Sequence, residues 1–198
     1  KKNPSVKNMI FYLVFDFETT GLENTSAEPV NFPVQFACQL TTAGGVVVDE
    51  FDTLIKGARR LSDWTQQNCP HLNLERCNRE GIELVELLQR IISVIEDSDC
   101  ILVAHNMEYD WDKVLCHAVR EKGLEENINF RKLQSLKRMC TCVHDNHKYW
   151  NERWNKWCGP KLMDLAYKCN VDFDNTRAHD AMYDVTVTRR CLVEILSH

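Results

Sequence analysis

The sequence predicts one α/β domain built on a mixed sheet. Strand patterns come first and are joined by a hairpin signal, and strands then alternate with helices towards the end of the chain. At 198 residues, of which 44% are apolar, the chain is long enough for one domain with a sizeable core. We therefore treat residues 1–198 as a single domain. Because the chain does not begin with methionine, we expect it to be excised or trimmed from a longer one.

The N-terminal half contains three strand patterns and one helix pattern. The apolar run at 9–15 predicts a buried first strand, and the residues at 43–45, Ala-Gly-Gly, predict a hairpin between the next two. Ile82, Val85, Leu88 or Gln89, and Ile92 recur at helical spacing and predict the inner face of a helix. The expected elements are strands at 10–17, 34–42 and 46–55, an irregular segment at 56–78 and a helix at 80–96.

The C-terminal half alternates strands and helices. Gly123 predicts the end of one helix and Pro160 the start of another. His179 or Asp180 opens the last helix. The expected elements are strands at 100–104 and 136–141, helices at 108–122 and after 160, and a last helix whose inner face is Ala181, Val185, Thr188, Leu192 and Ile195.

Three short blocks combine acidic residues with histidine. Asp16 and Glu18 are two apart on the first strand, so both side chains leave the same face. Two such carboxylates repel each other unless a cation or a proton lies between them, and oxygen-only ligands suit Mg²⁺ or Mn²⁺. The third block adds a carboxylate and a histidine that can take up a proton near neutral pH. The set predicts metal-assisted hydrolysis of a phosphodiester. The blocks read FDFETTG at 15–21, HNMEYD at 105–110 and HDAMYD at 179–184.

These blocks resemble the Exo I, II and III motifs of the DEDDh 3′→5′ exonucleases, a family that includes the epsilon proofreading subunit of bacterial DNA polymerase III and oligoribonuclease. The matching forms are D-x-E-T-T-G, H-N-x-x-aromatic-D and H-x-A-x-x-D, in that order, and the resemblance spans residues 11–196. The stretch from Lys161 to Val185 also resembles the proofreading-type branch. The resemblance implies a ribonuclease-H-like fold, with a central sheet of about five strands, the second antiparallel to the rest, and helices on both faces.

The resemblance also implies a site for two ions, Mg²⁺ or Mn²⁺. Asp16, Glu18 and Asp184 would surround one ion, and Asp16 would bridge to a second, held by Asp110, often through water. His179 would be the general base that deprotonates the attacking water.

Neighbouring residues compete for these roles. Glu108 and Asp112 lie on other faces of the helix that carries Asp110, where such residues are ordinarily solvated. Asp180 suits a helix N-terminus, where the dipole favours an acidic residue. His105 follows a buried strand, and we expect it to be structural.

The substrate contacts expected from the resemblance are Thr20, Leu22 and Asn106. In the family, the main chain and an apolar residue at this point contact the 3′-terminal nucleotide. A simple turn explains Thr20 and Leu22 equally well.

Residues 131–161 hold eight Lys or Arg against Asp145 and Glu152, together with Trp150, Trp154 and Trp157. Basic residues interleaved with aromatics can hold single strands by stacking and phosphate contacts. The three tryptophans are at helical spacing, which favours a core role for at least two of them. The basic side chains remain candidates for phosphate contacts.

The same stretch raises the question of zinc. Its candidate ligands are Cys140, Cys142, His144, His147 and Cys158. The C-x-C-x-H-x-x-H spacing is not a usual structural zinc pattern, and the sequence leaves zinc binding open.

Bulk properties limit the remaining classes. The net charge of −5 argues against broad non-specific binding to nucleic acid, although four of the negative charges belong to the expected metal site. The longest apolar run has seven residues, far short of a membrane span, and no signal-peptide pattern precedes it. Ten cysteines at irregular spacings, with this resemblance, fit an intracellular protein, cytoplasmic or nuclear, whose thiols stay reduced.

The resemblance therefore implies a 3′→5′ exonuclease that releases nucleoside 5′-monophosphates from single-stranded or frayed DNA ends, with a polymerase as a candidate partner and no membrane. An RNA-directed exonuclease is the alternative, because nothing in the motifs reads the sugar 2′-OH. An inactive nucleic-acid-binding module ranks lower. It would be expected to have lost one of Asp16, Glu18, Asp110, His179 or Asp184, and all five are present.

Overall fold

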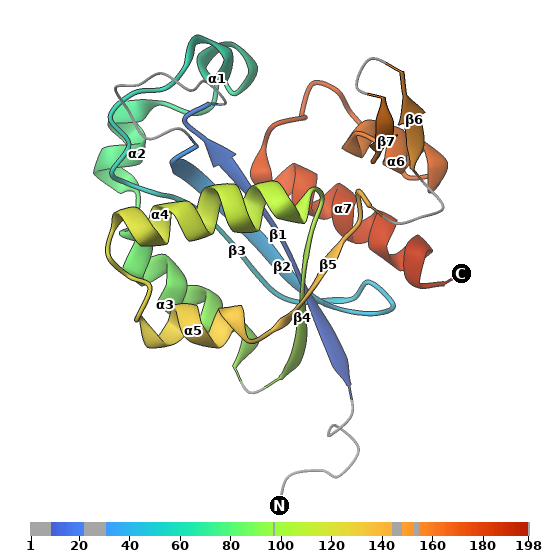
Figure 1. Cartoon of the computed structure of the whole chain (residues 1–198), viewed down its shortest axis with the longest axis horizontal. Coiled ribbons are helices and arrows are strands. Elements are labelled where there is room, and N and C mark those ends of the chain that lie inside the picture. The colour runs from blue at the N-terminus through green and yellow to red at the C-terminus, as the bar shows by residue number, and fades with distance from the viewer. Residues whose placement is uncertain (1–8, 22–30, 97, 144–147, 153–154, 198) are drawn as a thin grey trace, which may run out of the picture.

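A mixed sheet of five strands forms the centre of the computed structural model, which describes residues 9–21, 31–96, 98–143, 148–152 and 155–197 (Figure 1). The strand order is β3-β2-β1-β4-β5, and β2 is antiparallel to the other four. Fold class, strand number and the direction of the second strand are confirmed. The strands are β1 (Ile10–Thr19), β2 (Pro33–Thr42), β3 (Val47–Leu54), β4 (Asp99–Ala104) and β5 (Lys137–Cys140).

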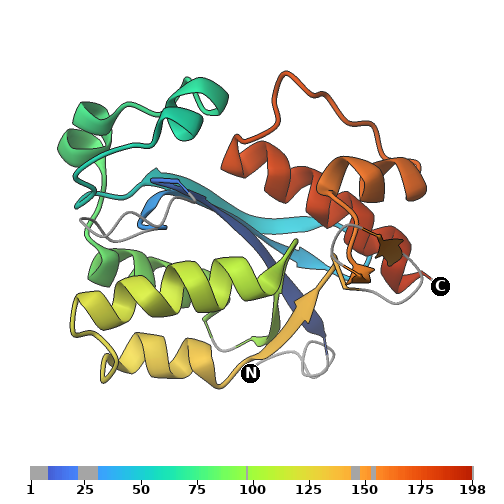
Figure 2. The same cartoon turned by 45° about the horizontal axis from the view of Figure 1, so that its top comes forward.

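Helices cover both faces of this sheet (Figures 1 and 2). One face carries α3 (Leu84–Ile95), α5 (Ile128–Gln134) and a π-helical segment, η2 (Glu108–Leu115), that runs directly into α4 (Cys116–Glu121). The other face carries α7 (Ala181–Leu196), with α6 (Leu162–Lys168) packed against it. Two short helices, α1 (Asp63–Asn68) and α2 (Leu74–Glu80), lie between β3 and α3. Among the described residues, no helix is long and apolar enough to cross a membrane.

The central strand β1 contributes to the core on both of its faces. Leu13, Phe15 and Phe17 belong to the larger apolar cluster, which includes residues of α3 and α5. Tyr12 and Val14 belong to a second cluster with residues of α7. Because side chains alternate along a strand, Asp16 and Glu18 follow Val14 on the α7 face.

β1 also extends beyond its parallel neighbour. Its pairing with β4 ends at Val14 opposite Val103, whereas its pairing with β2 continues to Glu18 opposite Gln35. The last residues of β1 therefore have a free edge on the β4 side. Polar groups of other elements can reach that edge.

The predicted strands and the last helix are confirmed, with ends that differ by one or two residues. All five residues predicted for the inner face of α7 are buried. Gly123, at φ 64°, follows α4 in the left-handed conformation expected of a helix end.

The predictions for 56–78 and 80–96 were wrong in part. Residues 56–78 are not wholly irregular, because the side chains of Ser62 and Asn73 cap α1 and α2 by accepting backbone N–H bonds. The long helix begins only at Leu84, and Ile82 instead forms a bridge to Ile55. Its buried residues are Leu84, Leu87, Leu88, Ile91 and Ile95. Val85 is 44% exposed, whereas Leu88 is buried as predicted, so the predicted inner face was only partly correct. Helix α5 was not predicted.

The expected tryptophan stripe was also wrong. Two short antiparallel strands, β6 (Tyr149–Asn151) and β7 (Lys156–Cys158), pair as a hairpin where a helix was expected. Asn155, at φ 47°, lies in the connection, and asparagine tolerates that conformation better than most residues. Trp150 and Trp157 are 47% and 64% exposed, so neither is a core residue. Trp154 lies outside the described residues.

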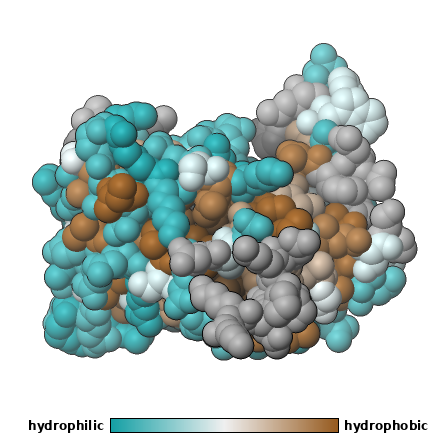
Figure 3. Space-filling view, turned by 90° about the horizontal axis from the view of Figure 1, so that it is seen from below, coloured by the Kyte–Doolittle hydropathy of each residue, from teal (hydrophilic) through white to brown (hydrophobic). Residues whose placement is uncertain are grey.

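The end of the sheet opposite the cleft described below is shown in Figure 3, where brown hydrophobic side chains lie among hydrophilic ones. Ile10, Ile101 and Leu136 line a shallow hollow at the first residues of β1, β4 and β5. Among the described residues, the one group of three side chains able to hold a metal ion lies elsewhere, at Glu18, His179 and Asp184. This candidate metal-binding group is therefore at the other end of the sheet.

Phe36 on β2 is the centre of an aromatic cluster, and its substitution tests this description of the core. Its ring centroid lies 4.9 Å from that of Phe17 and 5.3 Å from that of Phe51, and the side chain is 1% exposed. Phe36→Ala should lower the free energy of unfolding by about 3–5 kcal/mol, because it leaves a cavity between the sheet and its helices. Val48→Ala, at a position 55% exposed on β3, should change it by less than about 0.5 kcal/mol. Urea denaturation of both variants measures the difference, and equal losses would contradict this description of the core.

Candidate active site

An open cleft of about 710 Å³ lies where β1 and β4 end. It brings together every residue predicted as catalytic or metal-binding, together with Asn106. The lining residues are Asp16, Phe17, Glu18, Thr19, Gly21, Trp64, His105, Asn106, Tyr109, Asp110, His179 and Asp184. Of the other predicted substrate contacts, Thr20 is not among the lining residues and is held in a turn, and Leu22 lies outside the described residues.

That turn uses the polar groups of Thr20. Its N–H donates to the carbonyl of Phe32, its carbonyl accepts from the N–H of Ser62, and its hydroxyl accepts from the N–H of Phe32 at 3.1 Å. Gly21 follows at φ 138°, and a Cβ there would lie 2.3 Å from Ser62 Oγ. The geometry therefore favours the turn interpretation for Thr20.

Glu18 is held from the α1 side. Its side chain is 7% exposed, and Cys69, which ends α1, donates its thiol hydrogen to Oε2 over 3.5 Å. Asp16 lies two residues earlier on the same face of β1. The two carboxylates thus share the α7 side of β1, as their spacing predicted.

Asp110 reaches the same strand from its free edge. It is 2% exposed, and its Oδ1 accepts the backbone N–H of Phe17 at 3.3 Å. Glu108 is exposed and pairs with Lys113 at 3.0 Å, and Asp112 is exposed. The choice of Asp110 over its neighbours agrees with this arrangement.

His179 and Asp184 come from the start of α7. Asp180 caps the helix by accepting the N–H of Tyr183 at 3.0 Å, as expected of an acidic residue there. His179 precedes it at φ 66° and donates its backbone N–H to Asp184 Oδ2 at 3.2 Å. Asp184 Oδ1 is buried and has no hydrogen-bond partner.

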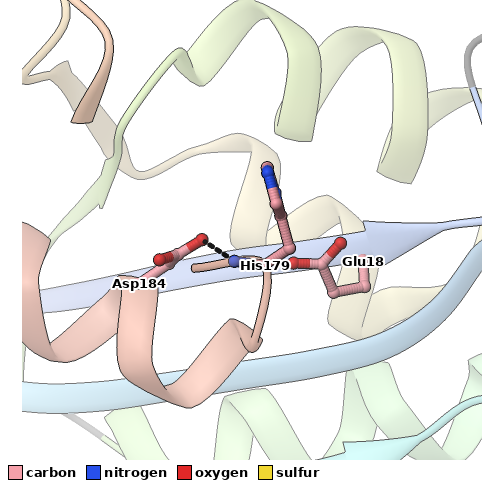
Figure 4. Close-up of side chains that lie close together, drawn as sticks. All are labelled: Glu18, His179 and Asp184. Carbon is pink, nitrogen blue, oxygen red and sulfur yellow. Dashed lines mark hydrogen bonds between the residues drawn. The ribbon is translucent and has the colours of Figure 1, made fainter. Parts of the chain in front are cut away.

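Glu18, His179 and Asp184 converge in space (Figure 4). One ligand atom of each lies within 4.8 Å of the other two. In Figure 4 the two carboxylates lie on either side of His179, whose ring extends away from the strand. The ring edge also contacts Trp64, with centroids 5.1 Å apart.

The electrostatics of the cleft disfavour the ionised carboxyl groups. Burial raises the pKa of Asp16, Glu18 and Asp110 well above the usual values, and neighbouring carboxylates raise each pKa further. Burial also raises the pKa of Asp184, to about 7, although the N–H of His179 opposes the shift. Burial lowers the pKa of His179, which favours a neutral imidazole. No Lys or Arg is among the residues that line the described cleft.

These features fit divalent cations. Four carboxyl groups, of which those of Glu18 and Asp110 are buried and those of Asp16 and Asp184 half-buried, repel one another without a positive charge between them. Asp184 Oδ1 lacks a hydrogen-bond partner, and a cation would supply one. Carboxylate oxygens are the ligands that Mg²⁺ and Mn²⁺ prefer. The residues present therefore suit the group that the sequence predicted.

His105 is structural, as expected. Its Nε2 lies 3.1 Å from the carbonyl of Pro160, to which it donates, and its Nδ1 lies 3.0 Å from the hydroxyl of Thr141. Burial lowers its pKa to about 4, so the ring is neutral. It fixes the start of α6 to the end of β4.

Sequence reasoning missed Trp64 and Tyr109, which line the cleft, and Cys69, which holds Glu18. Trp64 and Cys69 come from α1, a helix without an apolar period that could have revealed it. Tyr109 was seen only as the aromatic position of the second block, and its hydroxyl lies 3.0 Å from that of Thr19. The N-cap Ser62 followed by Asp63 was the one available signal for α1.

The zinc question stays open. Cys140 and Cys142 share a side-chain hydrogen bond, which lowers the pKa of Cys140 to about 5. His144 and His147 lie outside the described residues. Within the described part of the chain, these cysteines and Cys158 do not form a group able to hold a metal ion.

Comparison with known proteins assigns the family. The model of the RNase_T family, described as Exonuclease, matches residues 13–192. The chain belongs to this exonuclease family. Its members of the DEDDh type are 3′→5′ exonucleases, hydrolases that use divalent metals, so the resemblance seen in the sequence is confirmed.

A curated relative is the DNA polymerase III PolC-type of Mycoplasmopsis pulmonis, which is 28% identical over 189 residues. The alignment covers 94% of this chain but only 12% of that relative.

Two solved structures share the fold at 18% identity. One is E. coli Exonuclease I in complex with a dT13 oligonucleotide (TM-score 0.63, covering 90% of this chain and 39% of that one). The other concerns 3′-end specific recognition of a histone mRNA stem-loop by a 3′-exonuclease (TM-score 0.64, covering 96% and 82%).

The raised carboxyl pKa values predict how stability depends on pH when a chelator removes metal ions. A carboxyl group whose pKa is higher in the folded state binds more protons folded than unfolded, so stability falls as pH rises through that interval. For Asp184 the interval runs from about 4 to about 7. We expect Tm in EDTA to fall by several degrees between pH 5 and pH 8. Asp184→Asn should reduce this fall and raise Tm at pH 8.

Asp112→Asn is the matched control, because it removes an exposed carboxylate outside the cleft. It should retain the wild-type pH dependence. Scanning calorimetry across this pH range makes the measurement, and a Tm that rises with pH in EDTA would show that the cleft carboxylates are not destabilising.

Proposed function

We propose that this chain is a 3′→5′ exonuclease domain, dependent on Mg²⁺ or Mn²⁺, that removes nucleoside 5′-monophosphates from single-stranded or frayed DNA ends. The observation that carries the proposal is the meeting of four buried or half-buried carboxyl groups and His179 in one open cleft, without a basic side chain among the described lining residues. We treat residues 1–198 as one domain of a longer protein.

Asp16, Glu18, Asp110 and Asp184 would hold the ions. When bound, divalent ions acidify an attacking water and stabilise negative charge on the scissile phosphate. Asp110 is oriented for this role by the N–H of Phe17, and Asp184 by the N–H of His179. Both bonds leave further carboxylate lone pairs facing the cleft.

His179 would act as the general base. Its lowered pKa keeps the imidazole neutral at physiological pH, as a proton acceptor must be. The proton of the attacking water passes to an imidazole nitrogen, the new P–O bond forms, and the bond from phosphorus to the 3′ oxygen breaks. The leaving 3′ oxygen takes a proton from solvent. The products are a nucleoside 5′-monophosphate and a strand shorter by one nucleotide.

The cleft wall suits a strand end. Asn106, at φ 76°, lies in the turn after β4, Tyr109 lies in the first turn of η2, and Trp64 lines the same cleft from α1. Trp64 is 43% exposed and offers an aromatic surface to a base. We propose that these residues and Leu22 surround the terminal nucleotide.

DNA is the favoured substrate because the PolC-type relative is named as a DNA polymerase and aligns over 94% of this chain. The same alignment makes a polymerase the candidate partner. RNA is the second candidate, since the stem-loop exonuclease shares the fold over 82% of its own length. Such roles lie inside the cell, where the ten free thiols would stay reduced.

A substrate panel tests the proposed function. Single- and double-stranded DNA and RNA of matched sequence, labelled at the 5′ end, would be incubated with Mg²⁺, Mn²⁺ or EDTA. We expect a ladder shortened from the 3′ end, fastest on single-stranded DNA. Asp16→Asn should reduce cleavage to the EDTA level, because the proposed bridging ligand loses its charge. Undiminished cleavage in EDTA would refute the metal mechanism, and faster RNA cleavage would favour the second candidate.

The role of His179 has its own test. His179→Ala should lower kcat by roughly 10²–10⁴-fold, the range for a positioned general base. Wild-type activity should fall as pH drops through the pKa of His179, which burial places below its ordinary value. Metal affinity, measured by calorimetry, should barely change.

His117→Ala is the control, since this exposed histidine lies on α4. A near-normal single-turnover rate for His179→Ala would exclude the base role. Loss of metal binding would make His179 a ligand instead, which its distance from Glu18 and Asp184 permits.

A further inference from the structure

The β6–β7 hairpin exposes a pair of tryptophans. Trp150 and Trp157 stand directly opposite each other on the two strands. Their ring centroids are 5.8 Å apart and the rings are inclined at 75°, so the edge of one meets the face of the other. The exposed fractions of 47% and 64% show that much of each ring remains open to solvent.

The exposed tryptophan pair indicates a binding site. Large aromatic side chains gain stability from burial, and a cluster of them left on the surface usually marks a binding site. Tyr149, beside Trp150, is also exposed, at 41%. The contact between the two rings stabilises the short hairpin. The solvent-exposed faces of the rings have no such role in the described part of the chain.

The hairpin is attached to the wall of the cleft. Strand β7 ends at Cys158, and two residues later the carbonyl of Pro160 accepts from His105, which lines the cleft. The thiol of Cys142 donates to the same carbonyl at 3.5 Å. Figure 1 shows the hairpin beside α6, and in Figure 2 it lies towards the C-terminal end of α7 rather than the first turn, which carries Asp184. The segment that follows the hairpin therefore contacts the cleft wall at His105.

Charge identifies the occupant. Between positions 148 and 161 the sequence has four basic residues, Lys148, Arg153, Lys156 and Lys161, against Glu152. This local excess stands out in a chain whose net charge is −5. Flat apolar rings among positive charges match single-stranded nucleic acid, which offers base faces and phosphates together.

We propose that the β6–β7 hairpin is a stacking platform for single-stranded nucleic acid, binding nucleotides on the 5′ side of the end held in the cleft. The proposal rests on the proposed function, because it assigns the hairpin to the substrate of that cleft. Bases stack on Trp150 and Trp157, and the excess of basic residues in the sequence of this segment attracts the phosphates. Stacking does not read the sugar, so DNA and RNA are both accommodated.

The test compares short and long substrates in the full chain. Trp150→Ala/Trp157→Ala should raise KM for a 15-nucleotide strand about tenfold or more, the effect of losing base–aromatic stacking. For a dinucleotide, too short to reach beyond the cleft, kcat and KM should not change. Both dA and rA strands would be used, and intermediate lengths would show where the effect begins.

Three controls separate stacking from unfolding. Trp150→Phe/Trp157→Phe keeps aromatic faces and should restore much of the long-strand KM. Tyr167→Ala removes an 84% exposed aromatic of α6 outside the hairpin and should leave KM unchanged. Circular dichroism would show that the sheet and helices persist in each variant.

Binding gives a readout that does not need cleavage. In an Asp16→Asn background, fluorescence anisotropy of labelled dA and rA 15-mers should show weaker binding when both tryptophans are replaced by alanine. Equal affinity with and without the tryptophans would overturn the platform and assign the pair to a protein partner. Failure of the wild-type chain to cleave any strand, with the loss of affinity still observed, would refute the proposed function and leave the platform standing.

Discussion

Like charges crowded at one end of β1 are the constraint on which the site depends. Asp16, Glu18, Asp110 and Asp184 are all placed where burial and mutual repulsion raise their pKa values. Without cations, such an arrangement opposes folding, so the rest of the domain must stabilise it. The metal-free domain is therefore less stable than it would be without these carboxyl groups, but its oxygen ligands are already in position before an ion binds.

The central position of β1 makes this arrangement possible. The apolar residues Leu13, Phe15 and Phe17 anchor one face of the strand to the larger core, so its opposite face can carry acidic residues at its end. β4 stops earlier, which frees the N–H of Phe17 to hold Asp110. On the α7 side, the left-handed conformation of His179 turns its N–H onto Asp184. A backbone donor of β1 thus holds Asp110 of η2, and a backbone donor at the start of α7 holds Asp184.

Sequence could predict these parts because each leaves a local pattern. Alternation placed Asp16 and Glu18 on one face, and spacing within two further blocks selected Asp110, His179 and Asp184. Trp64 and Cys69 could not be found in this way, because α1 is held by a cap and by contacts with β1 rather than by an apolar period. The prediction of a helical tryptophan stripe failed for a related reason. A spacing of three or four residues is compatible with a helix and also with two short strands joined by a short connection. Only the pairing between the two strands, which the sequence does not show, distinguishes a hairpin from a helix.

The distribution of charge links the hairpin to the cleft. The segment 131–161 carries eight basic residues against two acidic ones, so the remainder of the chain is strongly acidic. A phosphate strand approaching the cleft alone would meet repulsion from its carboxylates, which bound cations offset only locally. A basic hairpin fixed to the cleft wall through Pro160 supplies attraction beyond the reach of those cations. Placing the positive charge on a separate element keeps it from neutralising the metal ligands, since a lysine inside the cleft would compete with the ions themselves.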